Sequence, residues 1–154
     1  MPAKAAVDDT AGMGVEQLRQ VRQIALALPE VVERRSHGAV CFFVQGRRPL
    51  CYYHDDHRGD GRVSLWYPAR ADVQDEMVTA EPGRFFRPQP SASGTFSTWL
   101  GLYLDLPGRD GVDWQEIAAI MYAAYRKVAP QHLIAELDRS LGEGGGDVRL
   151  SRPG

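Results

Sequence analysis

The chain has 154 residues, 18 of them basic and 20 acidic, and its formal net charge is −2 at pH 7. This length indicates a single domain that can bury a core without the help of a disulfide or a metal. The near balance of charge argues against a strongly basic nucleic-acid-binding module, whose isoelectric point would typically exceed about 9, but it leaves room for a local basic patch.

The two ends of the sequence differ from the part between them. Residues 1–13 are small and polar, and the segment 142–154 begins with four glycines in five positions. We therefore predict a flexible arm over 1–13, one domain over 14–141 and a flexible, glycine-rich tail over 142–154.

The sequence also carries signals about the compartment. The first residues lack the apolar stretch of a secretion signal, and no run approaches the ~18 apolar residues of a membrane span. We predict a cytoplasmic protein with no membrane partner. Cys41 and Cys51 lie in apolar segments and are expected to be reduced thiols in that compartment, with a disulfide between strands as the alternative.

The first half of the domain is predicted to be a helix followed by strands. Residues 15–28 repeat apolar side chains at helical spacing, and Pro29 ends this helix because the residue before a proline avoids the α conformation. Arg34 to Gly38 are predicted as a polar loop. The segments 39–45 and 50–54 are predicted as strands joined by the turn GRRP, because both are rich in strand-forming residues.

A polar loop over 54–61 then leads to a third strand over 62–67. Its residues alternate, with Val63, Leu65 and Tyr67 on one face and Arg62, Ser64 and Trp66 on the other. A helix of about ten residues follows Pro68 and stops at Pro82-Gly83.

The second half continues with strands and ends with helices. Residues 84–87 are predicted as a short edge strand. Residues 97–106 alternate again, with four leucines on one face and Trp99, Gly101 and Tyr103 on the other. Asp113 is predicted to cap a helix together with Glu116 three residues later, and Pro130 precedes a last helix over 131–141.

This order of elements indicates the fold class. Strands and helices do not alternate one for one, and the strands are joined by short turns, which predicts an α+β fold rather than a doubly wound sheet. We expect two layers: an antiparallel sheet with its helices on one face.

The face without helices is a candidate binding surface. If the apolar rows of the strands face the helices, the residues that face away are Trp66, Trp99, Tyr103 and Arg62, with Gly101 leaving room beside them and Tyr52 or Tyr53 joining according to register. An exposed aromatic patch usually marks a partner or ligand. The alternative is that the segment 83–95, or a second copy of the chain, covers this face.

Arginines around the loops form a second candidate. Arg34, Arg35 and His37 are either an ordinary polar loop or the start of a rim that binds phosphate or another anion. The rim would be extended by Arg47, Arg48, Arg84 and Arg87 if their loops converge, because the guanidinium fork suits phosphate oxygens.

Other chemistry has little support in the sequence. The stretch His54-Asp55-Asp56-His57 has metal-capable side chains but no regular ligand spacing. No glycine-rich phosphate loop, nucleophile elbow or paired CxxC is present. We therefore predict no catalytic residues, no metal and no cofactor.

Several motifs together resemble the MmcQ/YjbR (DUF419-type) family, over about Val15 to Leu141. They are Leu28-Pro29-Glu30, Ser36-His37-Gly38, Trp99, Asp113-Trp114, Tyr125 and Val128-Ala129-Pro130. The resemblance implies a two-layer α+β fold similar to secretion chaperones and frataxin-like proteins. It also implies DNA as the nominal partner, because the family's fold is similar to a double-wing DNA-binding motif.

Three functions follow as expectations. The first is a non-enzymatic, DNA-binding protein of the MmcQ/YjbR type. The second is a protein that binds or sequesters a planar aromatic metabolite or antibiotic on the aromatic sheet face, since one family member is associated with antibiotic biosynthesis genes. The third is a protein-binding adaptor. Monomer and homodimer both remain open.

Overall fold

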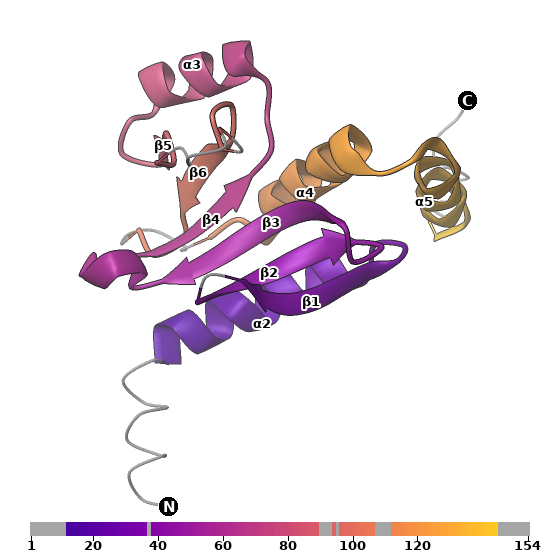
Figure 1. Cartoon of the computed structure of the whole chain (residues 1–154), viewed down its shortest axis with the longest axis horizontal. Coiled ribbons are helices and arrows are strands. Elements are labelled where there is room, and N and C mark those ends of the chain that lie inside the picture. The colour runs from indigo at the N-terminus through magenta and orange to yellow at the C-terminus, as the bar shows by residue number, and fades with distance from the viewer. Residues whose placement is uncertain (1–11, 37, 90–93, 95, 107–111, 145–154) are drawn as a thin grey trace, which may run out of the picture.

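The structure is a computed structural model, and it describes residues 12–36, 38–89, 94, 96–106 and 112–144. Six strands form one antiparallel sheet in the order β1-β2-β3-β4-β6-β5 (Figure 1). The strands are β1 (Val31–Ser36), β2 (Ala39–Val44), β3 (Arg48–Asp55), β4 (Val63–Tyr67), β5 (Phe85–Phe86) and β6 (Leu100–Tyr103). The helices are α2 (Gly12–Leu26), α3 (Ala71–Ala80), α4 (Trp114–Val128) and α5 (Gln131–Gly144), and a short 3-10 turn, η1 (His57–Gly59), follows β3. The predicted α+β fold with an antiparallel sheet is confirmed.

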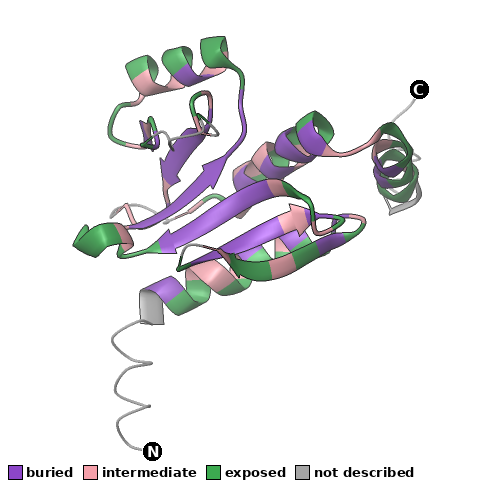
Figure 2. Cartoon of the chain, viewed as in Figure 1, coloured by how far each residue is buried: buried purple, intermediate pink, exposed green. Residues whose placement is uncertain are grey.

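The main core lies between the sheet and its helices. Alternate residues of the strands, such as Leu50 and Leu65, are fully buried against Val21 of α2 and against Met121 and Tyr125 of α4. Figure 2 shows the central strands buried and the outer edge at β1 largely exposed. All four described helices contribute side chains to this core, so one face of the sheet carries the helices, as expected.

A second, smaller cluster lies on the other face, which we call the helix-free face. It consists of Ala39, Cys41, Tyr52, Trp66 and Trp99, with Phe43, Phe86 and Phe96 packed against it. These residues alternate along their strands with members of the main core, as the period of two in a β-strand requires.

The prediction that Arg34 to Gly38 form a loop was wrong for its first residues. Arg34, Arg35 and Ser36 belong to β1, which pairs with β2 over its whole length. The strand was missed because only Val31 in it is buried, so it lacks an apolar alternation. Charged side chains are common on edge strands, where they discourage pairing with another chain. His37 lies outside the described residues.

The other strands follow their predicted alternation. Val63, Leu65 and Tyr67 of β4 join the main core, and Trp66 joins the opposite cluster. Leu100, Leu102 and Leu104 also face the main core. Cys41 and Cys51 are free and buried on opposite faces of the sheet, so their side chains point apart.

The predicted helix boundaries hold with small differences. The side chain of Asp113 accepts hydrogen bonds from the amides of Gln115 and Glu116, which confirms the cap of α4. Glu116 does not complete a capping box, because its carboxylate binds Arg84 at 2.7 Å. α2 begins slightly before the predicted domain limit and α5 ends slightly after it; the remaining arm and tail lie outside the described residues. None of the described helices combines the length and the apolar character needed to cross a bilayer.

Candidate functional site

A row of side chains crosses the helix-free face from one edge of the sheet to the other. Strand pairing places one residue of every strand in it: Arg34, Cys41, Tyr52, Trp66, Gly101 and Phe86. Phe96 and Trp99 pack on the middle of this row. We call Tyr52, Trp66, Phe96 and Trp99 the aromatic cluster.

The aromatic cluster is covered by the chain itself. Only 6% of Trp66 and 5% of Trp99 is exposed. The ring of Phe96 lies edge-on to Tyr52, Trp66 and Trp99, at centroid distances of 5.2, 5.4 and 4.9 Å. The sequence left open whether the segment 83–95 covers this face. Phe96, which packs on the cluster, directly follows that segment, and the segment itself is only partly described.

Gly101 makes the packing at one end of the row possible. A Cβ atom on this residue would lie 2.3 Å from the ring of Phe86, well inside van der Waals contact. The ring of Phe86 therefore occupies the room that was expected beside Gly101, and it also packs against Tyr103 at a centroid distance of 4.6 Å.

Arg62 and Tyr103 form a fixed pair at the same end of the sheet. The guanidinium carbon lies 3.7 Å from the centre of the Tyr103 ring, and Nη2 binds Asp105 at 2.9 Å. Burial alone would raise the pKa of Asp105, but hydrogen bonds from Arg62 and the Val63 amide outweigh it, so that the pKa is lowered. Arg62 is thus held in place by a carboxylate and an aromatic ring at once.

Two histidines border the aromatic cluster. The ring of His54 lies 4.2 Å from that of Trp66 and 4.4 Å from that of His57, and His57 lies 5.1 Å from Trp66, all measured between centroids. His54 is 7% exposed. Burial, reinforced by the charge of His57, lowers the pKa of His54 to about 4, so its ring is neutral at pH 7.

Two polar atoms of this group have no hydrogen-bond partner among the described residues. They are Nε2 of His54 and Nε1 of Trp66, both buried. A third such atom, Oε1 of Gln17, belongs to an amide whose nitrogen binds the carbonyl of Leu104 at 3.1 Å. Large majorities of buried polar atoms in proteins have a partner, so an unpaired one calls for an explanation.

Two hollows open beside the histidines. The first has a volume of about 810 Å³ and runs from Gly14 and Val15 of α2, past Ala39 and Tyr52, to His54 and Phe96. The second has a volume of about 430 Å³ and is bordered by Ser64, Phe86 and Tyr103. His57, Trp66 and Gln89 line both hollows. Volumes of this size are typical of small-molecule sites.

The floor of the first hollow is tied to the sheet. The hydroxyl of Tyr53 donates to the carbonyl of Gly14 at 2.5 Å, which fixes the beginning of α2 against β3. The charged residues that line this hollow are two basic ones, Arg35 and Arg58, and two acidic ones, Asp55 and Asp56. The hollow therefore has no strong preference for either sign of charge.

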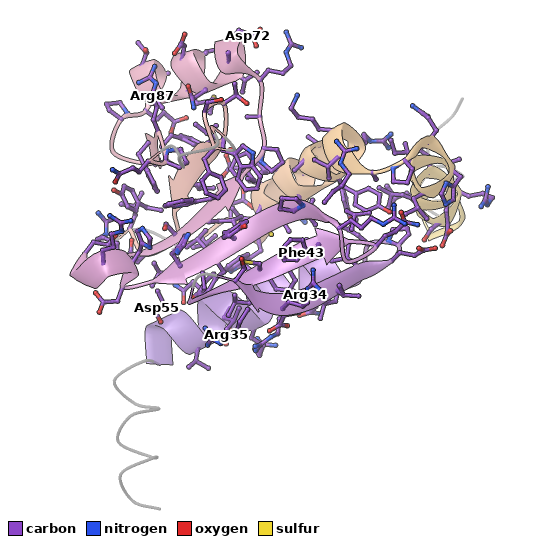
Figure 3. The ribbon with its side chains drawn as sticks, in the orientation of Figure 1. Arg34, Arg35, Phe43, Asp55, Asp72 and Arg87 are labelled. Atoms are coloured by element: carbon purple, nitrogen blue, oxygen red, sulfur yellow. The ribbon has the colours of Figure 1, made fainter. Side chains whose placement is uncertain are left out.

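The structure brings together only part of the predicted arginine rim. Nη2 of Arg34 donates to the carbonyl of Gly46 at 2.7 Å, which places this guanidinium at the β2–β3 turn that carries Arg47 and Arg48. Neither of these two has a carboxylate partner among the described residues. Arg34 also lies 4.7 Å above the ring of Phe43, on the helix-free face (Figure 3).

The remaining rim residues do not join them. Arg35 follows Arg34 in a strand, so it points to the opposite face. It lines the first hollow together with Val15 and Leu18 of α2, so this hollow extends from the helix-free face around to the side of α2. Arg84 and Arg87 flank β5 at the far edge of the sheet, and each binds carboxylates: Arg84 binds Glu81 and Glu116, and Arg87 binds Asp75. Figure 3 shows Arg87 near α3, far from Arg34 and Arg35.

No metal site emerges from the described part of the chain. No three His, Cys, Asp or Glu side chains in it are grouped so that they could hold an ion. His54 and His57 instead pack ring against ring, and His54 turns toward Trp66.

Comparison with known proteins supports the fold. No protein-family model matches the sequence, and no curated protein matches it. Among solved structures, the Deinococcus radiodurans protein DR2400, which has a DUF419 domain, is similar to this chain with a TM-score of 0.55 and 14% sequence identity. The match covers 75% of this chain and 80% of that one. The two proteins share a fold, and the fold expected from the resemblance is confirmed to that extent.

The sequence identified Trp66, Trp99, Tyr103 and Arg62, but it did not assign His54, His57, Phe86 or Phe96 to the face. The β3–β4 register would have placed Tyr52 and His54 on this face. Tyr52 pairs with Trp66 and His54 pairs with Ser64, and the two are two positions apart in their strand. Phe96 has no such signal, because it precedes the strand whose alternation was recognised.

Proposed function

We propose that the protein is a non-catalytic binding protein that takes up a flat, uncharged aromatic molecule on the helix-free face. The observation that carries this proposal is the pair of hollows that share Trp66 as a lining residue, the first lined also by Tyr52 and Phe96 and the second by Phe86 and Tyr103. Aromatic walls favour flat rings, through offset or edge-to-face contact. The balanced charges around the first hollow favour a neutral molecule over an anion.

The test is a binding measurement with a panel of uncharged compounds of two or three fused aromatic rings. Equilibrium dialysis gives the dissociation constant for each compound, and a saturated compound of the same size serves as the reference. We expect flat compounds to bind and the saturated compound to bind far more weakly. Trp66→Ala and Trp99→Ala are expected to weaken binding, whereas Trp114→Phe, in α4 on the other side of the sheet, leaves it unchanged.

The proposal fails if no flat compound binds with a dissociation constant below about 1 mM, the weak end of the affinity scale. It also fails if Trp114→Phe weakens binding as much as the changes on the helix-free face.

Nucleic acid is the second candidate. The observation that favours it is the group of Arg34, Arg47 and Arg48 at one end of the sheet, where the latter two lack carboxylate partners among the described residues. Their number is small, and the net charge of −2 opposes binding. Non-specific affinity for duplex DNA would depend on salt, with a slope of about −0.9 for each phosphate contacted.

Fluorescence anisotropy with labelled duplex and single-stranded oligonucleotides at about 50 mM salt, where such binding is strong, tests this candidate. Arg47→Ala/Arg48→Ala is expected to abolish the signal. The matched control is Arg70→Ala/Arg87→Ala, which removes two exposed arginines that already have carboxylate partners. No binding in the micromolar range, or equal loss in both double variants, would rule out nucleic acid at this end of the sheet.

A further inference from the structure

Two unpaired polar atoms lie where the two hollows meet. Trp66 lines both hollows and His54 lines the first, and their rings are in contact at a centroid distance of 4.2 Å. Their atoms Nε1 and Nε2 are buried without a partner among the described residues. Only 6% of the surface of Trp66 and 7% of that of His54 is exposed. Each of these atoms could bind a ligand only after a side chain that packs on the two rings has moved aside.

His57 is the side chain that packs on both of these rings. Its ring packs on His54 and on Trp66, and it is only half-buried. The backbone beneath it is fixed, because the Asp56 amide donates to the Arg62 carbonyl at 2.8 Å and Asp56 Oδ1 accepts from the Gly61 amide at 2.7 Å. A half-buried ring on a fixed backbone moves by rotation of its side chain, which takes nanoseconds or less for exposed groups.

The backbone of this turn has further unusual geometry. Asp56 and Arg58 both have left-handed conformations, with φ of 65° and 54°. Residues other than glycine rarely adopt such angles, and strained residues of this kind cluster at ligand clamps and switch regions. His57 lies between Asp56 and Arg58 in the turn.

We propose that Trp66 Nε1 and His54 Nε2 together recognise a carbonyl and an adjacent N–H on the edge of a flat ring, as in an aromatic lactam, and that such a ligand displaces the ring of His57. The indole N–H can only donate, so the ligand has to supply an acceptor to it. The neutral imidazole of His54 accepts at Nε2 when its proton is on Nδ1, which matches the ligand N–H. This inference rests on the proposed function and adds the chemical class of the ligand.

The decisive comparison uses two probes of nearly the same shape. Isoquinolin-1-one carries the carbonyl and the N–H, and naphthalene has neither. Equilibrium dialysis measures both dissociation constants for the parent protein and for Trp66→Phe, which keeps an aromatic ring but removes the donor. We expect the parent to bind isoquinolin-1-one about fivefold or more tightly than naphthalene, the effect of one or more hydrogen bonds to otherwise unsatisfied groups. Trp66→Phe is expected to remove this preference and to leave naphthalene binding nearly unchanged.

A second pair of variants tests the role of each histidine. His54→Phe keeps a buried ring without the acceptor and is expected to reduce the preference for isoquinolin-1-one, as Trp66→Phe does. His57→Ala removes the covering ring and is expected to strengthen the binding of both probes. Trp114→Phe is the control and is expected to leave the preference intact.

The outcomes separate the two levels of the proposal. If both probes bind equally to the parent, recognition by the two unpaired atoms is wrong while the proposed function stands. If neither probe binds, the proposed function itself is wrong for flat rings of this size. If His57→Ala weakens binding, His57 is part of the binding wall and the displacement step is wrong.

Discussion

The two faces of the sheet are built on different principles. On the helix-covered face the strands contribute Val63, Leu65 and a row of leucines, and the helices close over them. On the helix-free face the same strands contribute Trp66, Tyr52, Tyr103 and His54, and Trp99 directly precedes β6. Among the described residues, Phe96 and His57 pack on this group. The first face stabilises the fold by burial of apolar area. The second also carries polar ring atoms, which contribute nothing to stability by apolar burial.

Buried polar atoms without a partner among the described residues occur on both sides of the sheet, one on the helix-covered side, Oε1 of Gln17, and two on the helix-free face. On the helix-covered face the hydroxyl of Tyr125 donates to the Pro29 carbonyl at 2.7 Å, and the Tyr53 hydroxyl donates to Gly14. On the helix-free face Trp66 Nε1 and His54 Nε2 have no partner among the described residues. The proposed binding site rests on the fact that the two unpaired atoms of the helix-free face belong to rings in contact with each other.

The largest expected effect separates two adjacent phenylalanines on opposite faces. Phe42 is fully buried in the main core, and Phe43 is only partly buried beside Arg34. Phe42→Ala should lower the free energy of unfolding by about 3–5 kcal/mol, the usual cost of such a cavity. Phe43→Ala should cost about 1 kcal/mol, because less surface is lost and the cation–π contact is exposed. Urea unfolding measures both, and equal losses would contradict the division of roles between the faces.

The second prediction concerns His54 and acid. The folded protein holds the pKa of this ring at about 4, whereas the unfolded chain has about 6.5. Between these values the unfolded state binds more protons, so the free energy of unfolding falls as the pH is lowered from about 6.5 towards 4, by about 3 kcal/mol in total from this residue. No loss from His54 is expected above that window.

The control for this pH effect is His54→Phe, which removes the titrating group. Its urea unfolding curves at pH 7 and pH 4.5 should differ less than those of the parent. His132→Ala, an exposed histidine on α5, should retain the full effect. A parent protein and a His54→Phe variant that lose the same stability on acidification would show that His54 is not buried as described.

The third prediction tests the contact of Gly101 with Phe86. Gly101→Ala places a methyl group 2.3 Å from the Phe86 ring, so the ring has to move, at a cost of about 1–2 kcal/mol. Gly101→Ala/Phe86→Ala should cost less than the sum of its single changes, because the clash is absent when the ring is absent. Additive losses in thermal or urea unfolding would mean that Phe86 does not lie over Gly101.

The smallest effect is expected for the arginines at the β2–β3 turn. Arg47→Ala/Arg48→Ala should change the free energy of unfolding by no more than about 0.5 kcal/mol for each site, because both residues are exposed and neither binds a carboxylate among the described residues. The contrasting variant is Arg62→Ala, which leaves the largely buried Asp105 without its ion pair and should cost more. A larger loss for the turn arginines than for Arg62 would reverse this ranking.

The parts of the fold that could be predicted share a physical reason. β4 and the segment that includes β6 alternate between apolar residues against the helices and aromatic residues on the other face, so Trp66 and Trp99, which directly precedes β6, could be assigned to the same side. The cap at Asp113 and the stops at Pro29 and Pro82 are local and independent of the rest of the chain. Features of this kind can be predicted because they depend only on residues close together in the sequence.

The parts that could not be predicted depend on pairing across the sheet. β1 has a single buried residue and becomes a strand because β2 provides a partner along its whole length. The arginine rim assumed that loops converge, but the strand order places Arg34 and Arg84 near opposite edges. The contact between His54 and Trp66 follows from the β3–β4 register, which the long polar loop between the two strands did not fix.

The most direct test of the aromatic site is an NMR titration that follows the indole N–H resonances of the three tryptophans, Trp66, Trp99 and Trp114. Single Trp→Phe variants assign the resonances, and isoquinolin-1-one is the titrant. The resonance of Trp66 should shift most, that of Trp99 less, and that of Trp114, in α4 on the helix-covered face, hardly at all. A shift that is largest at Trp114, or no shift at any of the three at millimolar ligand, would contradict the assignment of the helix-free face as a binding site.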